Sequence, residues 1–295
     1  MDDLVLYEKI GRVARVTLNS PHNLNAWTFP HHPGGMTQAF VQKMQLAADD
    51  DDVTAVVIDA VGRAFSSGAD VKHIGFVYGI GTGQPGERRA SQRIRLQRDG
   101  ELMEFYRWVM LFPKITIAQV QGPCIGLAFL LVSCCDLCVA ADDAKFMRSD
   151  QRMGLAANAL DFNHMVLNIG LKRTLHLLMT GGTLSGTEAA NMGLINEAVP
   201  GADLAERTWA LAQQVASAPR DGVAIGKAMR VLNYESLGLL QGIDIHRIAH
   251  TMFTNIRWEK DEFNYFKERR DNGAKQAFGA RDASYEKAAK RPKKQ

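Results

Sequence analysis

Two short turns rich in small residues are the part of this chain whose residue types could do chemistry. Residues 64–72 read AFSSGADVK, and residues 120–126 read VQGPCIG. Each turn follows an apolar run typical of a buried strand, at 55–58 and at 115–118. Glycine allows sharp turns, so two such turns can aim two backbone N–H groups into one pocket. That arrangement holds an oxygen atom that becomes negative during a reaction. The pattern predicts an enzyme that stabilises an enolate or a similar oxyanion.

Strands and helices that could position these turns alternate along the first two thirds of the chain. Apolar residues recur at helical spacing over 36–48, and they occupy most positions of 53–60, as in a strand covered on both faces. The expected series is a strand pair within 4–18 turning at 11–12, a helix at 36–48, strands at 53–60 and 115–120, a helical segment at 130–135 and a strand at 137–141. This order predicts an α/β fold built as a spiral of ββα repeats.

The last third of the chain has a different, helical pattern. Helices are predicted at 205–218, 222–232, 237–254 and 261–270. We therefore expect a ββα core with the pocket over residues 1–203 and a helical subdomain over residues 204–295. The basic stretch 287–295 is predicted to be a solvated tail of this second part.

Composition and charge exclude several classes of function. The 295 residues are 46% hydrophobic and 23% charged, as in an ordinary globular protein, and a net charge of +3 makes no case for nucleic acid or membrane binding. The four cysteines lie in an apolar region without a second ligand pair, which favours buried reduced thiols over a metal site. No signal peptide and no apolar run of about 20 residues is visible. We therefore expect a cytoplasmic protein.

Ordered motifs along the chain resemble the crotonase (enoyl-CoA hydratase/isomerase) superfamily. Besides the two turns, they lie at 19–26, 178–185, 189–199, 253–254 and 266–270. The likeness extends from about Val5 to about Arg270. It implies a crotonase-like spiral with a C-terminal helical subdomain that assembles as a homotrimer or a dimer of trimers. It also implies an acyl-CoA thioester substrate and no separate cofactor, because coenzyme A is part of the substrate.

The resemblance assigns the backbone N–H groups of Ala69 and Leu127 as the two donors of an oxyanion hole. Losing one such donor typically costs ~3 kcal/mol, and a backbone donor does not depend on its own side chain. Substrate-binding roles are implied for Gly68, Ala69, Asp70, Val71, Lys72 and Leu130. Asp70 is also expected to cap the helix that follows it.

Hydratases of this family carry two glutamates, and here the sequence departs from them. The place of the first glutamate is occupied by Leu130, whose alkyl chain cannot move a proton. The place of the second is occupied by Asp150, which we expect to be the catalytic acid/base. A single carboxylate suits isomerisation of an enoyl-CoA, or an atypical hydration or hydrolysis, better than ordinary hydration. Glu101 and Glu104 are possible substitutes for the missing acid.

Two further interpretations of the same residues stay open. Leu127, Leu130 and Met147 are bulkier than the family pattern, which would suit a non-catalytic acyl-CoA-binding or assembly protein. Asp150 lies between Arg148 and Arg152, so it could be a plain salt-bridged loop residue.

The segment between the two turns offers a possible lid and several basic groups. Residues 74–84 are glycine-rich, and they are expected to form a mobile lid over the pocket rather than a dinucleotide fingerprint, because no strand precedes them at the right place. The arginines that follow could meet coenzyme A phosphates or lie on a solvated helix face; they are Arg88, Arg89, Arg93, Arg95 and Arg98. His73 and His164 match no family position and are expected to be structural or surface residues.

Overall fold

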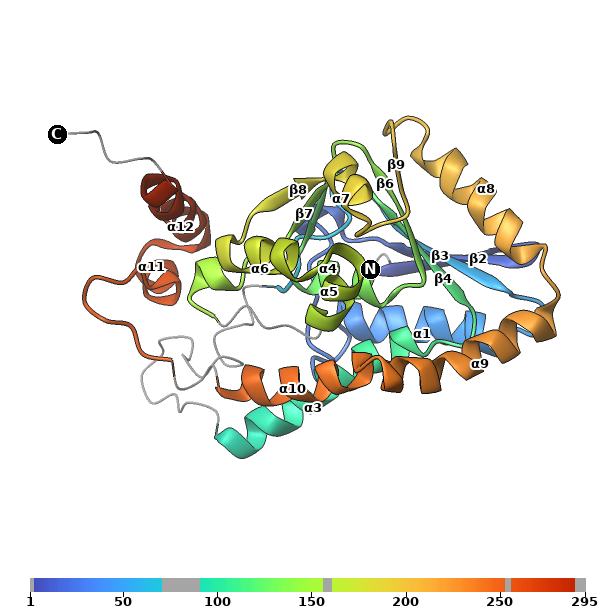
Figure 1. Ribbon diagram of the computed structural model, residues 1–295, viewed down its shortest axis with the longest axis horizontal. Helices are drawn as coiled ribbons and strands as arrows, with labels where there is room; N and C mark the ends of the chain where they lie inside the picture. The colour runs from blue at the N-terminus through green and yellow to red at the C-terminus, as the bar shows by residue number, and fades with distance from the viewer. Residues whose placement is uncertain (1–2, 71–90, 156–160, 253–255, 290–295) are drawn as a thin grey trace.

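A computed structural model describes residues 3–70, 91–155, 161–252 and 256–289 of the chain. A twisted, mostly parallel sheet with helices on both sides forms its centre (Figure 1). In spatial order its strands are β1 (Val5–Ile10), β2 (Val13–Leu18), β3 (Ala55–Ala60), β4 (Ile115–Val120), β6 (Leu137–Ala141) and β9 (Glu197–Val199). Only β1 and β2 run antiparallel, and they are joined at residues 11–12 as predicted. The remaining neighbours in the sheet are parallel.

A second, smaller sheet is formed by short strands, two of which directly follow strands of the first sheet along the chain. It consists of β5 (Pro123–Ile125), β7 (Lys145–Met147) and β8 (Thr183–Ser185), with β5 parallel to β7 and β7 antiparallel to β8. β5 follows β4 directly, and β7 follows β6, so these two turns of the chain each contribute one strand to each sheet. The predicted α/β fold of repeating ββα units is confirmed.

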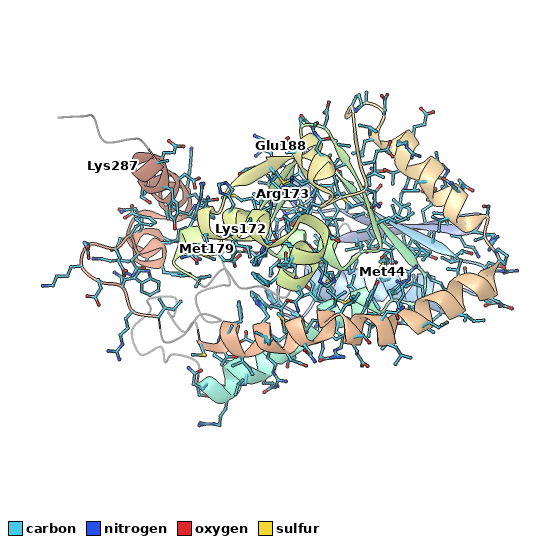
Figure 2. All side chains as sticks on the ribbon, in the orientation of Figure 1. Met44, Lys172, Arg173, Met179, Glu188 and Lys287 are labelled. Atoms are coloured by element: carbon cyan, nitrogen blue, oxygen red, sulfur yellow. The ribbon has the colours of Figure 1, made fainter. Side chains whose placement is uncertain are left out.

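Helices between the strands close the core. They are α1 (Met36–Asp49), α3 (Gln92–Met110), α4 (Leu127–Cys134), α5 (Phe162–Ile169), α6 (Leu171–Thr180) and α7 (Gly186–Met192). Met44 of α1, labelled in Figure 2, is fully buried. The predicted helix 36–48 is therefore confirmed. The predicted segment 130–135 overlaps the second half of α4, which begins three residues earlier and ends at Cys134.

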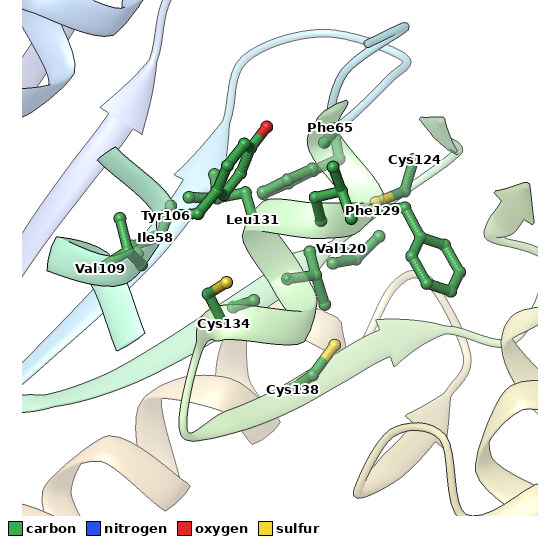
Figure 3. Close-up of a cluster of buried hydrophobic side chains, with 14 of the residues drawn as sticks. Ile58, Phe65, Tyr106, Val109, Val120, Cys124, Phe129, Leu131, Cys134 and Cys138 are labelled. Carbon is green, nitrogen blue, oxygen red and sulfur yellow. The ribbon is translucent and has the colours of Figure 1, made fainter. Parts of the chain in front are cut away.

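Helix α4 is apolar on nearly all sides because it runs through the middle of the protein. Figure 3 shows Phe129, Leu131 and Cys134 of this helix within the buried cluster that also contains Val120 and Tyr106. Burying one such leucine or phenylalanine contributes about 1.5–3 kcal/mol relative to its exposure. The rigid core therefore holds the N-terminus of α4, and with it the second predicted turn, in a fixed place.

The C-terminal region is helical, as predicted. It consists of α8 (Leu204–Ala216), α9 (Arg220–Ser236), α10 (Leu239–Met252), α11 (Tyr265–Asn272) and α12 (Ala274–Ala289). Helix α8 packs on the main sheet, and α10 runs along α3 (Figure 1). Helix α12 was not predicted; it covers the start of the stretch expected to be a solvated tail, and Lys287 on it is exposed (Figure 2).

No helix in the described part of the chain has the length and apolar character needed to span a bilayer.

Candidate active site

The two predicted turns meet at one cavity of about 250 Å³. Its described wall includes Gly68 and Ala69 from the first turn, and Leu127 and Leu130 from α4. Asp150 belongs to the same wall and comes from the segment that follows β7. Helices α10 and α12 complete it with the remaining side chains that matter below, which are His246, His250, Phe278 and Arg281.

Backbone hydrogen bonds hold the two turns against each other. The N–H of Phe65 donates to the carbonyl of Gln121 at 2.7 Å, and the N–H of Ile125 donates to the carbonyl of Ser66 at 3.2 Å. Gly68 has a φ of +87°, and a Cβ placed on it would lie 2.4 Å from the Ile125 carbonyl oxygen and 3.5 Å from the Leu127 nitrogen. Only glycine fits such a close approach of two backbones. The first turn is therefore seated directly on the second.

The backbone N–H of Ala69 is available to a ligand, because the backbone hydrogen bonds at this turn use groups of Gly68 and Asp70 instead. Trp27 donates its N–H to the Gly68 carbonyl at 2.7 Å and accepts from the Asp70 N–H at 2.8 Å. This bridge uses the groups on either side of Ala69 and not its own N–H. Within the described residues the Ala69 N–H makes no hydrogen bond.

The amide of Leu127 is available for a different reason. Leu127 is the first residue of α4, and the cap residue before it, Gly126, has no side chain that could accept from it. The first backbone bond of the helix is donated by Leu130 to the Gly126 carbonyl, at 3.1 Å. The Leu127 N–H therefore has no partner among the described residues, and it lies at the positive end of the helix dipole.

Asp150 is held at the cavity by an arginine that also contacts the second turn. The side chain of Asp150 is 21% exposed, and its Oδ2 lies 3.1 Å from Nη2 of Arg148. Arg148 is fully buried and donates from Nη1 to the Gly126 carbonyl at 3.0 Å. Asp150 therefore does form a salt bridge with one of its neighbouring arginines, and that arginine is Arg148. Arg152 instead donates to the Thr180 carbonyl and pairs with Asp282.

A second carboxyl group shares this arginine and was not predicted. Asp161 is completely buried, and its Oδ2 lies 3.9 Å from Nε of Arg148. Burial raises the pKa of Asp161; the Arg148 charge opposes this rise and the charge of Asp150 adds to it. Asp161 is not in the wall of the cavity, so it stands behind Arg148 rather than beside a substrate.

Two histidines on one face of α10 were also missed. His246 and His250 both reach the cavity wall, and their ring centroids lie 5.4 Å apart. Nδ1 of His250 lies 2.7 Å from Oδ1 of Asp99, a fully buried residue of α3. The sequence did carry a signal for this pair: the two histidines are four residues apart within a predicted helix, and that spacing places both rings on the same face of the helix.

Several other expectations about the site are corrected. Glu101 lines a separate cavity between α1 and α3, and the Glu104 side chain is 69% exposed, so neither reaches the site. Arg95 lies on no solvated face; it is buried and pairs with Asp99 at 3.2 Å. As expected for a structural residue, His164 lies away from this site and lines a different cavity, where burial lowers its pKa to about 4.

The residues predicted to bind substrate are found only in part in the wall of this cavity. Of those expected to bind substrate, Gly68, Ala69 and Leu130 line the cavity and Asp70 does not. Val71 and Lys72 lie outside the described residues, as do His73, the expected lid at 74–84 and the helix that Asp70 was expected to cap.

The cysteines are free thiols, three of them buried. Burial raises the pKa of Cys135 to about 12 and raises those of Cys124, Cys134 and Cys138 as well, so all four are protonated at neutral pH. Within the described ranges, no group of three or more potential ligand residues is arranged to hold a metal ion.

Comparison with known proteins points to one family. The sequence model described as "Enoyl-CoA hydratase/isomerase" matches residues 8–276. A Thermus thermophilus relative, whose name assigns it provisionally to the enoyl-CoA hydratases, is 30% identical over 267 residues, 90% of this chain and 98% of its own. The hydroxycinnamoyl-CoA hydratase-lyase of Pseudomonas fluorescens is 30% identical over 69% of each chain. The crystal structure of an enoyl-CoA hydratase/isomerase from Xanthobacter autotrophicus Py2 superposes with a TM-score of 0.79 at 26% identity, covering 95% of this chain and 98% of that one.

Proposed function

Since this chain belongs to the enoyl-CoA hydratase/isomerase family, we propose that it processes an acyl-CoA thioester through an enolate. In this proposal the N–H groups of Ala69 and Leu127 hold the thioester oxygen, and Asp150 moves the proton. The proposal rests on one observation: two backbone amides, unpartnered among the described residues, and one carboxylate line the same cavity.

The two amides would act by accepting charge as it develops. When the α-proton leaves, the electron pair moves onto the thioester oxygen, which then sits between two fixed N–H dipoles. A preorganised donor of this kind is typically worth about 3 kcal/mol in the transition state. The tight seating of Gly68 on the second turn supports the proposal, because donors that cannot relax stabilise charge without reorganising.

Asp150 would serve as the base at the α-carbon. As a carboxylate it takes the α-proton, and as a carboxylic acid it returns the proton to the same carbon or to the γ-carbon. The second outcome shifts a double bond, so the chemistry is isomerase-like. The same carboxylate could activate a water molecule, giving an atypical hydration or hydrolysis. Leu130 in the wall supplies no second carboxyl group, which disfavours ordinary hydration by two carboxylates.

Coenzyme A enters as part of the substrate, and no other cofactor is required by this scheme. We further propose that the protein works in the cytoplasm, which its free cysteines support, and that it assembles as a homotrimer or a dimer of trimers. Exposed apolar side chains along α9 support the assembly; they are Ile225, Met229 and Leu232.

The α-proton of a bound thioester provides the test. We expect the protein to exchange the α-protons of a saturated acyl-CoA with D2O, measured by NMR, and to isomerise 3-enoyl-CoA. Asp150→Asn should slow both by about 100-fold or more, the usual contribution of a general base. Asp271→Asn is the matched control, because Asp271 pairs with its exposed neighbour Arg270.

The same experiment separates the alternative. Tight acyl-CoA binding, measured by calorimetry, without exchange or turnover of 3-enoyl, 2-enoyl and 1,3-dicarbonyl thioesters would contradict the enzymatic proposal. It would identify a binding or assembly protein that has kept the pocket.

A further inference from the structure

A buried cluster of four polar side chains joins α3 to α10 behind the cavity. Asp99 is its centre: Oδ1 contacts Nδ1 of His250 at 2.7 Å, and Oδ2 accepts from the hydroxyl of Thr251 at 2.7 Å. Arg95 lies 3.2 Å from the same carboxylate and donates to the His250 carbonyl at 2.8 Å. The proton transfer described above uses none of these groups, although His250 belongs to the cavity wall.

The cluster determines which nitrogen of His250 carries the proton. Burial alone would raise the pKa of Asp99, but the hydrogen bond and charge of His250, the charge of Arg95 and the Thr251 hydroxyl outweigh it and lower that pKa. Asp99 is therefore an ionised carboxylate, which can only accept hydrogen bonds. Nδ1 of His250 must donate to it. With Nδ1 directed at Asp99, Nε2 is the ring nitrogen that would exchange a proton with a bound substrate.

We propose that His250 is a second proton-transfer group of this cavity, positioned by Asp99, and that with Asp150 it lets the protein add water to, or remove water from, an acyl-CoA thioester. The inference rests on the proposed function and extends it. It gives the cavity two groups that can move protons, where the position of Leu130 leaves only one carboxylate.

The step can be written in the direction of water loss from a 3-hydroxyacyl thioester. Asp150, as a carboxylate, takes the α-proton, and the electron pair moves onto the thioester oxygen between the two amides. The pair returns to form the Cα=Cβ bond while the Cβ–O bond breaks. His250, as an imidazolium, gives its Nε2 proton to the leaving hydroxyl, which departs as water. Asp150 then loses its proton and His250 regains one through solvent. Addition of water is the reverse.

Other charged groups lie around His250 at this end of the cavity. Arg95 and Asp99 face it from α3, and His246 lies one turn earlier on its own helix. The cavity wall adds the Arg148–Asp150 pair and Arg281 of α12, which is itself paired with Asp282. Arg95 Nη2 also lies 3.3 Å from Nδ1 of His250, but a guanidinium can only donate, so among the groups named here Asp99 is the acceptor that orients the ring.

Two reactions measured on one protein test the proposal. Hydration of a 2-enoyl-CoA, followed by loss of its absorbance, requires both groups, whereas α-proton exchange of a saturated acyl-CoA requires only Asp150 and the amides. We expect His250→Gln to lower kcat for hydration by about 100-fold or more and to slow α-proton exchange far less. The control is His176→Gln, an exposed histidine of α6, which should keep both activities.

Chemical rescue separates proton transfer from support of the fold. His250→Ala should regain part of its hydration rate when imidazole is added, because imidazole can enter the space left by the ring and carry the proton. The rescued rate should rise with imidazole concentration and saturate. His176→Ala should not respond.

The positioning role of Asp99 is tested by separating kcat from KM. Asp99→Asn keeps an oxygen that can accept from Nδ1 but removes the carboxylate charge. We expect kcat for hydration to fall with KM unchanged, because the ring is less firmly oriented while the substrate still binds. Asp99→Glu, which retains a carboxylate, should recover part of the lost kcat. Should the Asn variant fail to fold, the rescue experiment and the Glu variant still decide.

The possible failures are distinct. Hydration at the wild-type rate in folded His250→Gln, exchange without any hydration in the wild-type protein, or absence of imidazole rescue would each overturn the role of His250 and leave the proposed function intact. Absence of α-proton exchange in the wild-type protein would overturn the proposed function itself.

Discussion

Gly68 shows at the residue scale how one hydrogen atom in place of a side chain positions the candidate site. Its φ of +87° and the 2.4 Å that would separate an added Cβ from the Ile125 carbonyl oxygen both exclude other residues. We expect Gly68→Ala to destabilise the protein by about 1–3 kcal/mol and to abolish α-proton exchange, since the two turns must separate. Urea unfolding and the NMR assay would measure both effects.

Gly11 offers the matched control for that substitution. It also has a positive φ, of +61°, but a Cβ added there would have no atom within 4 Å. Gly11→Ala should therefore show backbone strain alone, with activity retained. Equal loss of activity in the two variants would contradict the role given to the close contact.

His164 makes a separate prediction about stability and pH. Burial lowers its pKa from 6.5 to about 4, so the unfolded chain binds a proton in this range that the folded protein does not. Stability should be fully present above about pH 6.5 and should fall by on the order of 3 kcal/mol as pH drops towards 4. His164→Gln should flatten this part of the stability curve, measured by urea unfolding at each pH. A variant with the wild-type slope would show that another group is responsible.

Sequence reasoning reached the residues that lie in continuous motifs. The two turns, Leu130 and Asp150 were all identified, and the structure brings them to one cavity. It did not reach Asp99 and His250, because these are 151 residues apart and meet only when α3 packs against α10. Glu101 shows the opposite error: it lies near the site in sequence, but its helix turns it towards a different cavity.

At the scale of the elements, α12 closes the cavity from a distant part of the chain. Phe278 and Arg281 form part of the wall, and the Tyr285 hydroxyl donates to the Gln151 carbonyl at 3.0 Å. Arg152 also stacks on the Tyr285 ring, 5.2 Å from its centroid. These contacts place α12 directly beside the segment that carries Asp150.

Weakening these contacts should loosen α12 without unfolding the core. A hydrogen bond contributes about 1 kcal/mol and a cation–π contact about 0.5–1 kcal/mol. We expect Tyr285→Leu to speed hydrogen exchange of α12 amides about tenfold and to raise KM for acyl-CoA more than it lowers kcat. Lys287→Ala, an exposed change on the same helix, is the control. Unchanged hydrogen exchange of the α12 amides in Tyr285→Leu would contradict the idea that these contacts hold α12 in place.

Helix α12 also shows where sequence patterns stop being informative. Its residues are mostly polar or small, and within the described residues only Ala277 and Arg281 of this helix are buried. A helix that is buried through so few positions has no clear apolar periodicity, so it was not recognised. The sheet strands were recognised because β3 and β4 are buried on both faces and read as continuous apolar runs.

At the scale of the whole molecule, α9 presents an apolar face that the single chain leaves uncovered. Ile225, Met229 and Leu232 are 60–68% exposed and recur at helical spacing. We expect a homotrimer or a dimer of trimers in solution, with a molar mass three or six times that of one chain by light scattering. Met229→Glu together with Ile225→Glu should shift the protein towards monomer.

Leu46→Glu is the control for that experiment. Leu46 is a similarly exposed apolar residue, but it stands on α1 rather than on α9. The assembly should tolerate it. A wild-type protein that is monomeric at micromolar concentration would contradict the expectation directly.

Arg148 joins two parts of the candidate site through a single side chain. Its guanidinium donates from Nη1 to the Gly126 carbonyl, just before Leu127, and pairs through Nη2 with the carboxylate of Asp150. In the proposed function, this one side chain therefore links the position of the amide that would hold the thioester oxygen to that of the carboxylate that would move the proton. We expect a substitution that removes the guanidinium to disturb both groups together, because each is held by a different nitrogen of the same side chain.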